Sequence, residues 1–110
     1  MPKKRILILE DDSKSLYALT AVLEQQGYSV AGFPDPASVN VDPEQFDTAI
    51  IDLRLPETPG ATFAAQLRKR NPKIRVVFVT AYAAVDGGDD LGGSPLLVKP
   101  LNVDELLTLI

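Results

Sequence analysis

The chain has 110 residues, 45% of them hydrophobic, and a formal net charge of −4, which is the size and composition of one globular domain. It has no cysteine and no histidine, which excludes disulfides, thiolate ligands and a histidine base, so a metal site must be built from oxygen ligands. The negative charge argues against nucleic-acid binding, and no apolar run approaches the ~18 residues that a membrane-spanning helix needs.

The first part of the chain predicts a buried strand followed by a helix. The apolar run at residues 5–9 is typical of a strand that is covered on both faces of a parallel sheet. Apolar residues then recur at helical spacing, so we expect a helix that Asp12 or Ser13 caps and Gly27 ends. Three adjacent acids at 10–12 separate the two elements, and their mutual repulsion calls for a bound cation or full solvation.

The middle of the chain predicts two more strands with an irregular segment between them. Residues 28–33 form the second strand. The segment 34–47 carries three prolines, which leaves room only for a short or irregular helix from about Ala37. Residues 48–51 form the third strand, which ends at Asp52 and is followed by the loop LRLPETPG.

Two further strands and an amphipathic helix follow. The helix at 61–70 carries basic residues in its last turn, where the helix dipole favours cations. Strands at 75–79 and 96–98 end next to Thr80 and Lys99 respectively.

The remaining segments favour only short helices. AYAAVDGGDDLGGS, at 81–94, contains four glycines and is poor helix material. Residues 103–110 predict a last helix of about two turns, with Asn102 as its N-cap. The chain shows no repeat and no domain linker.

Strands that alternate with helices predict an α/β domain with a parallel sheet and helices on both faces. Ligands of such sheets bind beyond the carboxyl ends of the strands. The polar residues that follow the predicted strands should therefore meet at one edge: Glu10, Asp11, Asp12, Asp52, Thr80 and Lys99. Each has a plain structural interpretation, as a charge cluster at a helix start, a turn residue, a β-prone threonine or a solvated lysine. Their shared position at one edge favours a site.

These groups suit phosphoryl transfer supported by a divalent cation. Carboxylates without histidine fit Mg²⁺, which binds phosphoryl oxygens at its remaining positions. A carboxylate such as Asp52 can accept a phosphoryl group as an aspartyl phosphate. The cation and Lys99 would neutralise the developing charge, and the Thr80 hydroxyl could donate to a phosphoryl oxygen.

Four stretches, ILILEDD, IIDLRLPETPG, VVFVTAY and LLVKP, resemble the receiver domain of two-component response regulators, over essentially the whole chain. The resemblance implies the flavodoxin-like fold, a doubly wound five-stranded parallel sheet in the order 2-1-3-4-5 with helices on both faces and, here, a short or irregular fourth helix. It implies that residues 1–110 are a single receiver domain with its last helix cut short. Such a domain is a phosphoryl-accepting signalling switch rather than a turnover enzyme.

The resemblance also assigns roles to individual residues. Asp52 would be the phosphoacceptor, Thr80 the switch hydroxyl and Lys99 the lysine that pairs with the phosphoryl group, with a Lys99–Pro100 bond that is commonly cis in the family. The phosphoryl donor would be a histidine kinase or a phosphotransfer protein. The start MPKKR lacks the apolar segment that a signal peptide needs, so we expect the chain in the cytoplasm. An output domain would be fused or separate, and a homodimer through the fourth and fifth helices is left open.

The metal would be Mg²⁺ (or Mn²⁺), by the same resemblance. Its ligands would be Asp52, Asp11 and the main-chain oxygen of Arg54, with Glu10 acting through water. The usual length of the family's first helix selects Asp11 over Asp12 as the direct ligand, and Asp12 then becomes the acid at the helix start.

The chain departs from the family pattern in three places. An aromatic residue is frequent three positions before the lysine, where this chain has Leu96, so coupling of an aromatic side chain to Thr80 is in question. The segment before Lys99 is shorter than usual, which affects the fourth helix and thus the surface through which the family usually acts on its output. The last helix stops at Ile110. Arg54 and Tyr82 occupy positions that flank the phosphoryl group in the family, and the large Arg54 would shield it from water.

Two alternatives stay open. A degenerate receiver would keep the fold as a phosphorylation-independent protein-binding module; Leu96 and the glycine-rich segment favour it, whereas the intact Asp52, Thr80 and Lys99 oppose it. A magnesium-dependent phosphatase with an aspartate nucleophile would usually carry an Asp-x-Asp pair on its first strand and a cap domain, and the sequence shows neither.

Overall fold

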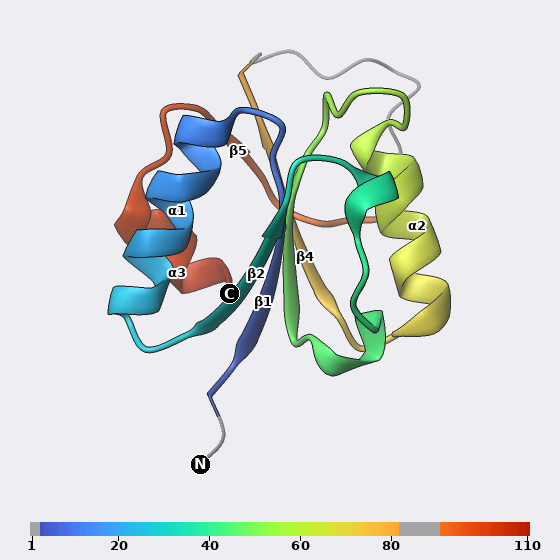
Figure 1. Ribbon diagram of the computed structural model, residues 1–110, viewed down its shortest axis with the longest axis horizontal. Coiled ribbons are helices and arrows are strands. Elements are labelled where there is room, and N and C mark those ends of the chain that lie inside the picture. The colour runs from blue at the N-terminus through green and yellow to red at the C-terminus, as the bar shows by residue number, and fades with distance from the viewer. Residues whose placement is uncertain (1–2, 82–90) are drawn as a thin grey trace.

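The computed structural model describes residues 3–81 and 91–110, which are built around a five-stranded parallel sheet (Figure 1). The order across the sheet is β2-β1-β3-β4-β5, which confirms the predicted order. The chain thus runs from β1 to β2 on one side and then crosses to β3 on the other side of β1, so the topological switch point lies between β1 and β3. The strands are β1 (Arg5–Leu9), β2 (Ser29–Phe33), β3 (Thr48–Asp52), β4 (Arg75–Thr80) and β5 (Leu96–Val98).

The central strands are buried on both faces, as their continuous apolar sequences predict. All five residues of β3 are buried, and in β1 only Arg5 is exposed. Because side chains alternate across a strand, β1 divides its residues between two clusters of the core. Leu7 and Leu9 contribute to one cluster, and Ile6 and Ile8 contribute to the other.

Helices cover both faces of the sheet, which confirms that prediction. In Figure 1, α1 (Ser13–Gln25) and α3 (Val103–Leu109) lie together on one face, and α2 (Gly60–Arg70) lies on the other. Buried side chains attach each layer to the sheet: Phe63, Ala64 and Leu67 from α2 on one side, and Leu23 from α1 and Leu106 from α3 on the other.

The ends of α1 and α3 follow the predicted capping signals. The Asp12 carboxylate accepts a hydrogen bond from the main-chain N–H of Ser15, and Asn102 accepts one from Glu105 in the same way. Gly27, just after α1, has φ +97°, a left-handed conformation that glycine adopts without a steric penalty. These caps fix where each helix starts relative to the strand before it.

The proline-rich segment between β2 and β3 forms two short 3₁₀ turns, Pro36–Ser38 and Pro43–Gln45, instead of an α-helix. This agrees with the prediction of a short or irregular helix. The side-chain amide of Asn71 donates to the carbonyl oxygens of Pro43 and Phe46, at 3.0 and 2.8 Å, and thereby ties the segment to the end of α2.

The segment between β4 and β5 is described at Ala81 and again from Leu91 onward. The predicted short fourth helix falls mainly on residues 82–90, which are outside the described residues, as is Tyr82. Residues 91–94 form a turn with Gly92 and Gly93 at positive φ, and this turn leads into β5. Among the described residues, no helix is both long enough and apolar enough to cross a membrane.

Candidate functional site

The polar residues that follow the strands lie together at the carboxyl edge of the sheet, as predicted. Leu9 pairs with Ile51, so Glu10 emerges from β1 beside the end of β3, where Asp52 lies. Thr80 ends β4 and pairs with Val98, directly before Lys99. The parallel register therefore brings the carboxyl ends of β1, β3, β4 and β5 to one location.

Glu10 is almost fully buried, with 3% of its surface exposed. Its Oε1 accepts a hydrogen bond from the Asp12 main-chain N–H at 3.0 Å, and its Oε2 accepts one from Lys99 Nζ at 2.5 Å. Burial raises the pKa of the Glu10 carboxyl, although the bonds from Lys99 and Asp12 act in the opposite direction. The lysine is therefore the main group that favours an ionised Glu10.

Asp52 is also buried, and both of its carboxylate oxygens are hydrogen-bonded. Lys99 Nζ donates to Oδ2 at 2.9 Å, and the main-chain N–H of Arg54 donates to Oδ1 at 2.9 Å. The Asp52 carboxylate is consequently held in one orientation by a cation on one side and by its own loop on the other.

Lys99 connects the two buried carboxylates through a single ammonium group. Burial disfavours its charge, but the hydrogen bonds to Glu10 and Asp52 outweigh burial, and the pKa of Lys99 lies above its ordinary value. Its main-chain N–H donates to the Thr80 carbonyl oxygen at 2.8 Å, which joins the ends of β4 and β5. The Lys99–Pro100 bond is cis, as the family resemblance implies.

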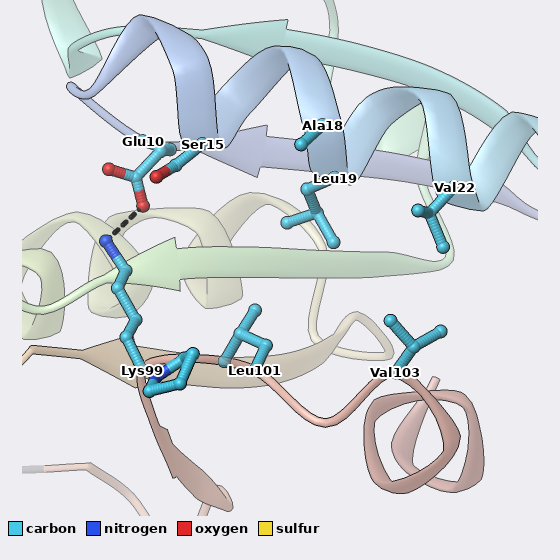
Figure 2. A pocket seen from close by; sticks show the side chains of 9 residues that line it. Glu10, Ser15, Ala18, Leu19, Val22, Lys99, Leu101 and Val103 are labelled. Atoms are coloured by element: carbon cyan, nitrogen blue, oxygen red, sulfur yellow. Dashed lines mark hydrogen bonds and ion pairs between the residues drawn. The ribbon is translucent and has the colours of Figure 1, made fainter.

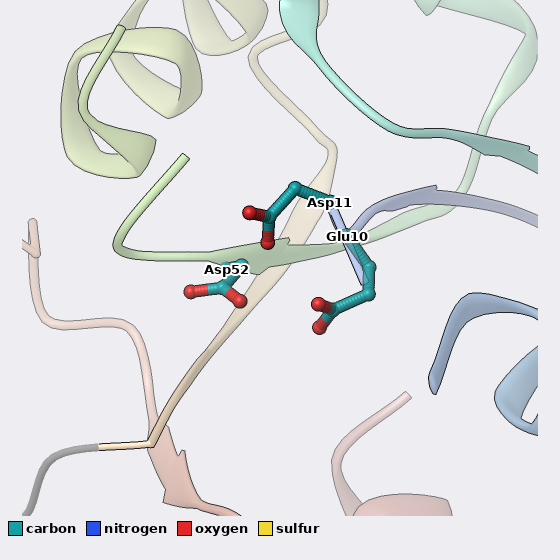
Figure 3. A group of neighbouring side chains, drawn as sticks. All are labelled: Glu10, Asp11 and Asp52. Atoms are coloured by element: carbon teal, nitrogen blue, oxygen red, sulfur yellow. The ribbon is translucent and has the colours of Figure 1, made fainter. Parts of the chain in front are cut away.

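Asp11 and Asp12 differ clearly in their surroundings. Asp12 accepts bonds from the N–H and hydroxyl of Ser15, at 3.1 and 2.5 Å, and the serine hydroxyl lowers the pKa of Asp12. The carboxylate of Asp11 instead lies over Asp52 (Figure 3), and one oxygen each from Glu10, Asp11 and Asp52 lies within 4.8 Å of the others. The geometry thus selects Asp11, not Asp12, as the acid that faces Asp52.

These carboxylates form a donor set that suits a hard divalent cation, because all three offer oxygen and no softer ligand is near them in the described part of the chain. Asp11 is exposed, and no other described residue forms a hydrogen bond with its carboxylate, so it is available to a cation. Glu10 and Asp52 already share Lys99. The residues present therefore fit the predicted metal. Of the three carboxylates, only that of Asp11 is not paired with Lys99.

The loop after β3 is fixed by main-chain contacts around Gly60. The Gly60 N–H donates to the Leu53 carbonyl oxygen at 3.0 Å, and Leu53 N–H donates to Val79 oxygen at 2.9 Å. A Cβ atom on Gly60 would lie only 2.2 Å from the Asp52 carbonyl oxygen. The LRLPETPG motif therefore needs glycine at its end because α2 begins in direct contact with the main chain of Asp52.

We expect Gly60→Ala to destabilise the protein by about 3 kcal/mol or more, since the start of α2 and the backbone of Asp52 and Leu53 must move apart. Gly27→Ala is the matched control: a Cβ there meets no atom within 4 Å, and only its left-handed φ should cost about 1 kcal/mol. Urea denaturation measures both free energies of unfolding. Equal losses in the two variants would contradict the close packing at Gly60.

An open groove of about 270 Å³ borders the charged site (Figure 2). Glu10 and Lys99 form its polar end, and apolar side chains from α1 and from the chain after Lys99 line the rest, including Leu19, Val22 and Leu101. Because 23% of the Lys99 side chain is exposed, the buried ion pair is reachable from outside.

Thr80, the predicted switch residue, and Leu96 occupy different environments. Thr80 is fully buried at the end of β4, at the same edge as Asp52. Leu96, which stands where the family often has an aromatic residue, is partly buried and packs against the core cluster beneath α2.

The chain matches the family model of the response regulator receiver domain over residues 6–110. The alginate biosynthesis transcriptional regulatory protein AlgB of Pseudomonas syringae pv. tomato is 40% identical over 107 residues, which cover 93% of this chain and 24% of AlgB. The response regulator receiver protein CpdR of Brucella abortus is 31% identical over 109 residues, which cover 94% of this chain and 91% of CpdR.

A solved structure resembles the whole described fold. The crystal structure of a response regulator protein from Burkholderia pseudomallei, with a phosphorylated aspartic acid, a calcium ion and citrate, superposes with a TM-score of 0.85 and 25% identity. The match covers 97% of this chain and 66% of that one. The chain thus spans nearly all of CpdR but about a quarter of AlgB.

Proposed function

The chain belongs to the response regulator receiver family, and on this basis we propose that it is a signalling switch in which Asp52 accepts a phosphoryl group. The observation that carries this proposal is the convergence of Asp52, Lys99 and Asp11 at the end of the central strand β3. The phosphorylated aspartic acid in the Burkholderia pseudomallei relative supports the same chemistry here.

The residues around Asp52 suggest how each would act. Asp52 would attack the donor's phosphorus through one carboxylate oxygen, so that a P–O bond to Asp52 forms as the bond to the donor breaks. The Arg54 N–H orients the carboxylate. The Lys99 ammonium already contacts Oδ2, so it could also pair with the phosphoryl group after transfer.

A divalent cation would supply further positive charge beside Asp52 and would stabilise the negative charge on the phosphoryl oxygens during transfer. We propose that Asp11, Asp52 and the main-chain oxygen of Arg54 hold it, with Glu10 acting through water. Mg²⁺ is the cation that we favour, since it binds through few carboxylates and through phosphoryl oxygens.

Phosphorylation would then be transmitted through the ends of β4 and β5. The transferred group adds negative charge beside Lys99, whose main chain is bonded to that of Thr80. Movement of the Thr80 hydroxyl toward the phosphoryl group would shift a pre-existing equilibrium between two conformations. A useful shift requires differential stabilisation of a few kcal/mol.

We propose that residues 1–110 act as a single receiver domain in the cytoplasm and do not turn over a substrate. The donor is a histidine kinase or a phosphotransfer protein, and the output lies in a fused or separate domain. That AlgB is a transcriptional regulatory protein of about four times the matched length supports a fused output domain. A phosphorylation-independent binding module is the second candidate, favoured by Leu96 at the usual aromatic position.

Incubation of the wild-type chain with a small-molecule phosphodonor, with and without Mg²⁺, tests this proposal. We expect a gain of one phosphoryl group by intact mass, dependent on Mg²⁺ because the crowded carboxylates otherwise repel an anion. No gain by folded protein at saturating Mg²⁺ would instead support the binding module, and continuous release of inorganic phosphate from a generic phosphoester would support a phosphatase.

A further inference from the structure

Arg68, in the last turn of α2, reaches away from its helix to the turn that precedes β5. Its guanidinium donates to the Leu91 carbonyl oxygen at 3.2 Å and to the Ser94 hydroxyl. Figure 1 shows this part of the chain passing beside α2 before it enters β5. Arg70, two residues on, has an exposed side chain that forms an ion pair with Asp42 at 3.4 Å. The basic residues of this helix end therefore have different roles.

Gly92 accommodates the Arg68 guanidinium. A Cβ on Gly92 would lie 3.0 Å from Nη1 of Arg68 and 3.3 Å from its Cζ, so a side chain there would require the guanidinium to shift by a few tenths of an ångström. Gly93 also has a positive φ, of +80° against +59° for Gly92, but a Cβ on it would meet no atom within 4 Å. The contact with Arg68 thus distinguishes two glycines of the same turn.

The strand that follows this turn is short and lies at an edge of the described sheet. β5 has three residues, and its one partner among the described strands is β4. Leu97 is buried and Leu96 is partly buried, while Val98 is 43% exposed. Polar contacts secure both of its ends: Arg68 holds the turn before it, and Lys99 bonds Glu10 and Asp52 after it.

Helix α2 thereby contacts Asp52 directly and, through Arg68, the turn that leads to Lys99. Its first residue, Gly60, packs against the Asp52 main chain, and Arg68, two turns later, holds the turn that leads to Lys99. We propose that Arg68 is a positioning residue, which acts through β5 to place the Lys99 ammonium beside Asp52. The reaction to which it contributes is the phosphoryl transfer proposed above, so its effect on rate rests on that function.

Four variants of the full chain test this role: Arg68→Ala, Gly92→Ala and their controls Arg70→Ala and Gly93→Ala. We expect Arg68→Ala to slow phosphorylation by a small-molecule donor about tenfold or more, because a small displacement of a charged group is costly in such reactions. Gly92→Ala, which only shifts the guanidinium, should slow it by a smaller factor. Arg70→Ala should leave the rate unchanged, and Gly93→Ala should slow it less than Gly92→Ala. Mg²⁺ affinity, measured by calorimetry, should be retained, since the proposed ligands follow β1 and β3.

Coupling to Lys99 separates positioning from a general loss of structure. In a Lys99→Ala background, Arg68→Ala should cause no further loss of rate, because residues that act through one another are not additive. The same fractional loss in both backgrounds, or equal losses in Gly92→Ala and Gly93→Ala, would overturn the proposal.

Hydrogen exchange tests the placement of β5 without any phosphorylation. Arg68→Ala should speed amide exchange in residues 94–98 and leave β1 unchanged, whereas unchanged exchange in residues 94–98 would overturn the proposal. If the wild-type chain accepts no phosphoryl group, the proposed function fails, and the exchange result still decides whether Arg68 holds β5.

Discussion

Asp52→Asn is expected to abolish phosphoryl acceptance. The amide has nearly the shape of the carboxylate, but it is a poor nucleophile and cannot form an acyl phosphate. The fold should persist, because Lys99 keeps its 2.5 Å contact with the buried Glu10 carboxylate. Intact mass after incubation with a small-molecule donor and saturating Mg²⁺ should show no phosphoryl group on the variant, against one on the wild type.

Asp12→Asn provides the matched control for this substitution. It removes a neighbouring negative charge from the same edge, but asparagine also caps helices well, so α1 should keep its start. We expect this variant to accept a phosphoryl group much as the wild type does. An undiminished adduct on Asp52→Asn would contradict the assignment of Asp52.

Lys99→Ala is expected to slow phosphorylation about a hundredfold or more while Mg²⁺ binding is retained. The rate should fall because the variant lacks the ammonium that lies 2.9 Å from Asp52 Oδ2, and fixed charges of this kind are usually worth that much. Mg²⁺ affinity should persist because the proposed ligands are oxygens from other segments and the lost group is itself a cation. Single-turnover mass spectrometry gives the rate, and calorimetry gives the affinity.

Stability must be followed in the same variant, because Lys99→Ala leaves the buried Glu10 without its cation and should lower the free energy of unfolding. Circular dichroism defines a temperature at which the variant is folded, and Lys14→Ala, at an exposed position of α1, serves as the control. A loss of Mg²⁺ affinity as large as that of Asp11→Asn would contradict the role assigned to Lys99.

Sequence patterns predicted a parallel sheet and the edge at which the polar residues gather, whereas the strand order came from the family resemblance. The apolar runs of β1 and β3 are continuous because both faces are covered, and parallel strands bring the residues that follow them to one edge. The proline-rich segment was predicted to be irregular for a local reason that the structure bears out, since its prolines begin two 3₁₀ turns.

The contacts inside the site were less predictable, as the three adjacent acids illustrate. Their repulsion is relieved in three different ways: Glu10 pairs with Lys99, Asp12 caps α1, and Asp11 stays exposed facing Asp52. The Glu10 pairing joins residues 89 positions apart in the chain and depends on their final placement in space. No local pattern in the sequence could reveal it.

Two other features were visible in the sequence but could not be interpreted there. Gly60 belongs to a recognised motif, yet its close approach to the Asp52 carbonyl oxygen appears only when α2 is placed on the sheet. Arg68 was explained by the helix dipole together with its basic neighbours, and only its reach to Leu91 and Ser94 sets it apart. In both cases the missing information was tertiary.

Borohydride reduction of the phosphorylated chain identifies the residue that carries the phosphoryl group. The reagent reduces an acyl phosphate to an alcohol, so an aspartyl phosphate becomes homoserine, which tandem mass spectrometry can locate in a peptide. We predict homoserine at position 52 and nowhere else, in a yield that follows the Mg²⁺-dependent adduct. Reduction at Asp11 or Glu10 instead, or an adduct that resists reduction, would contradict the claim that Asp52 is the phosphoryl acceptor.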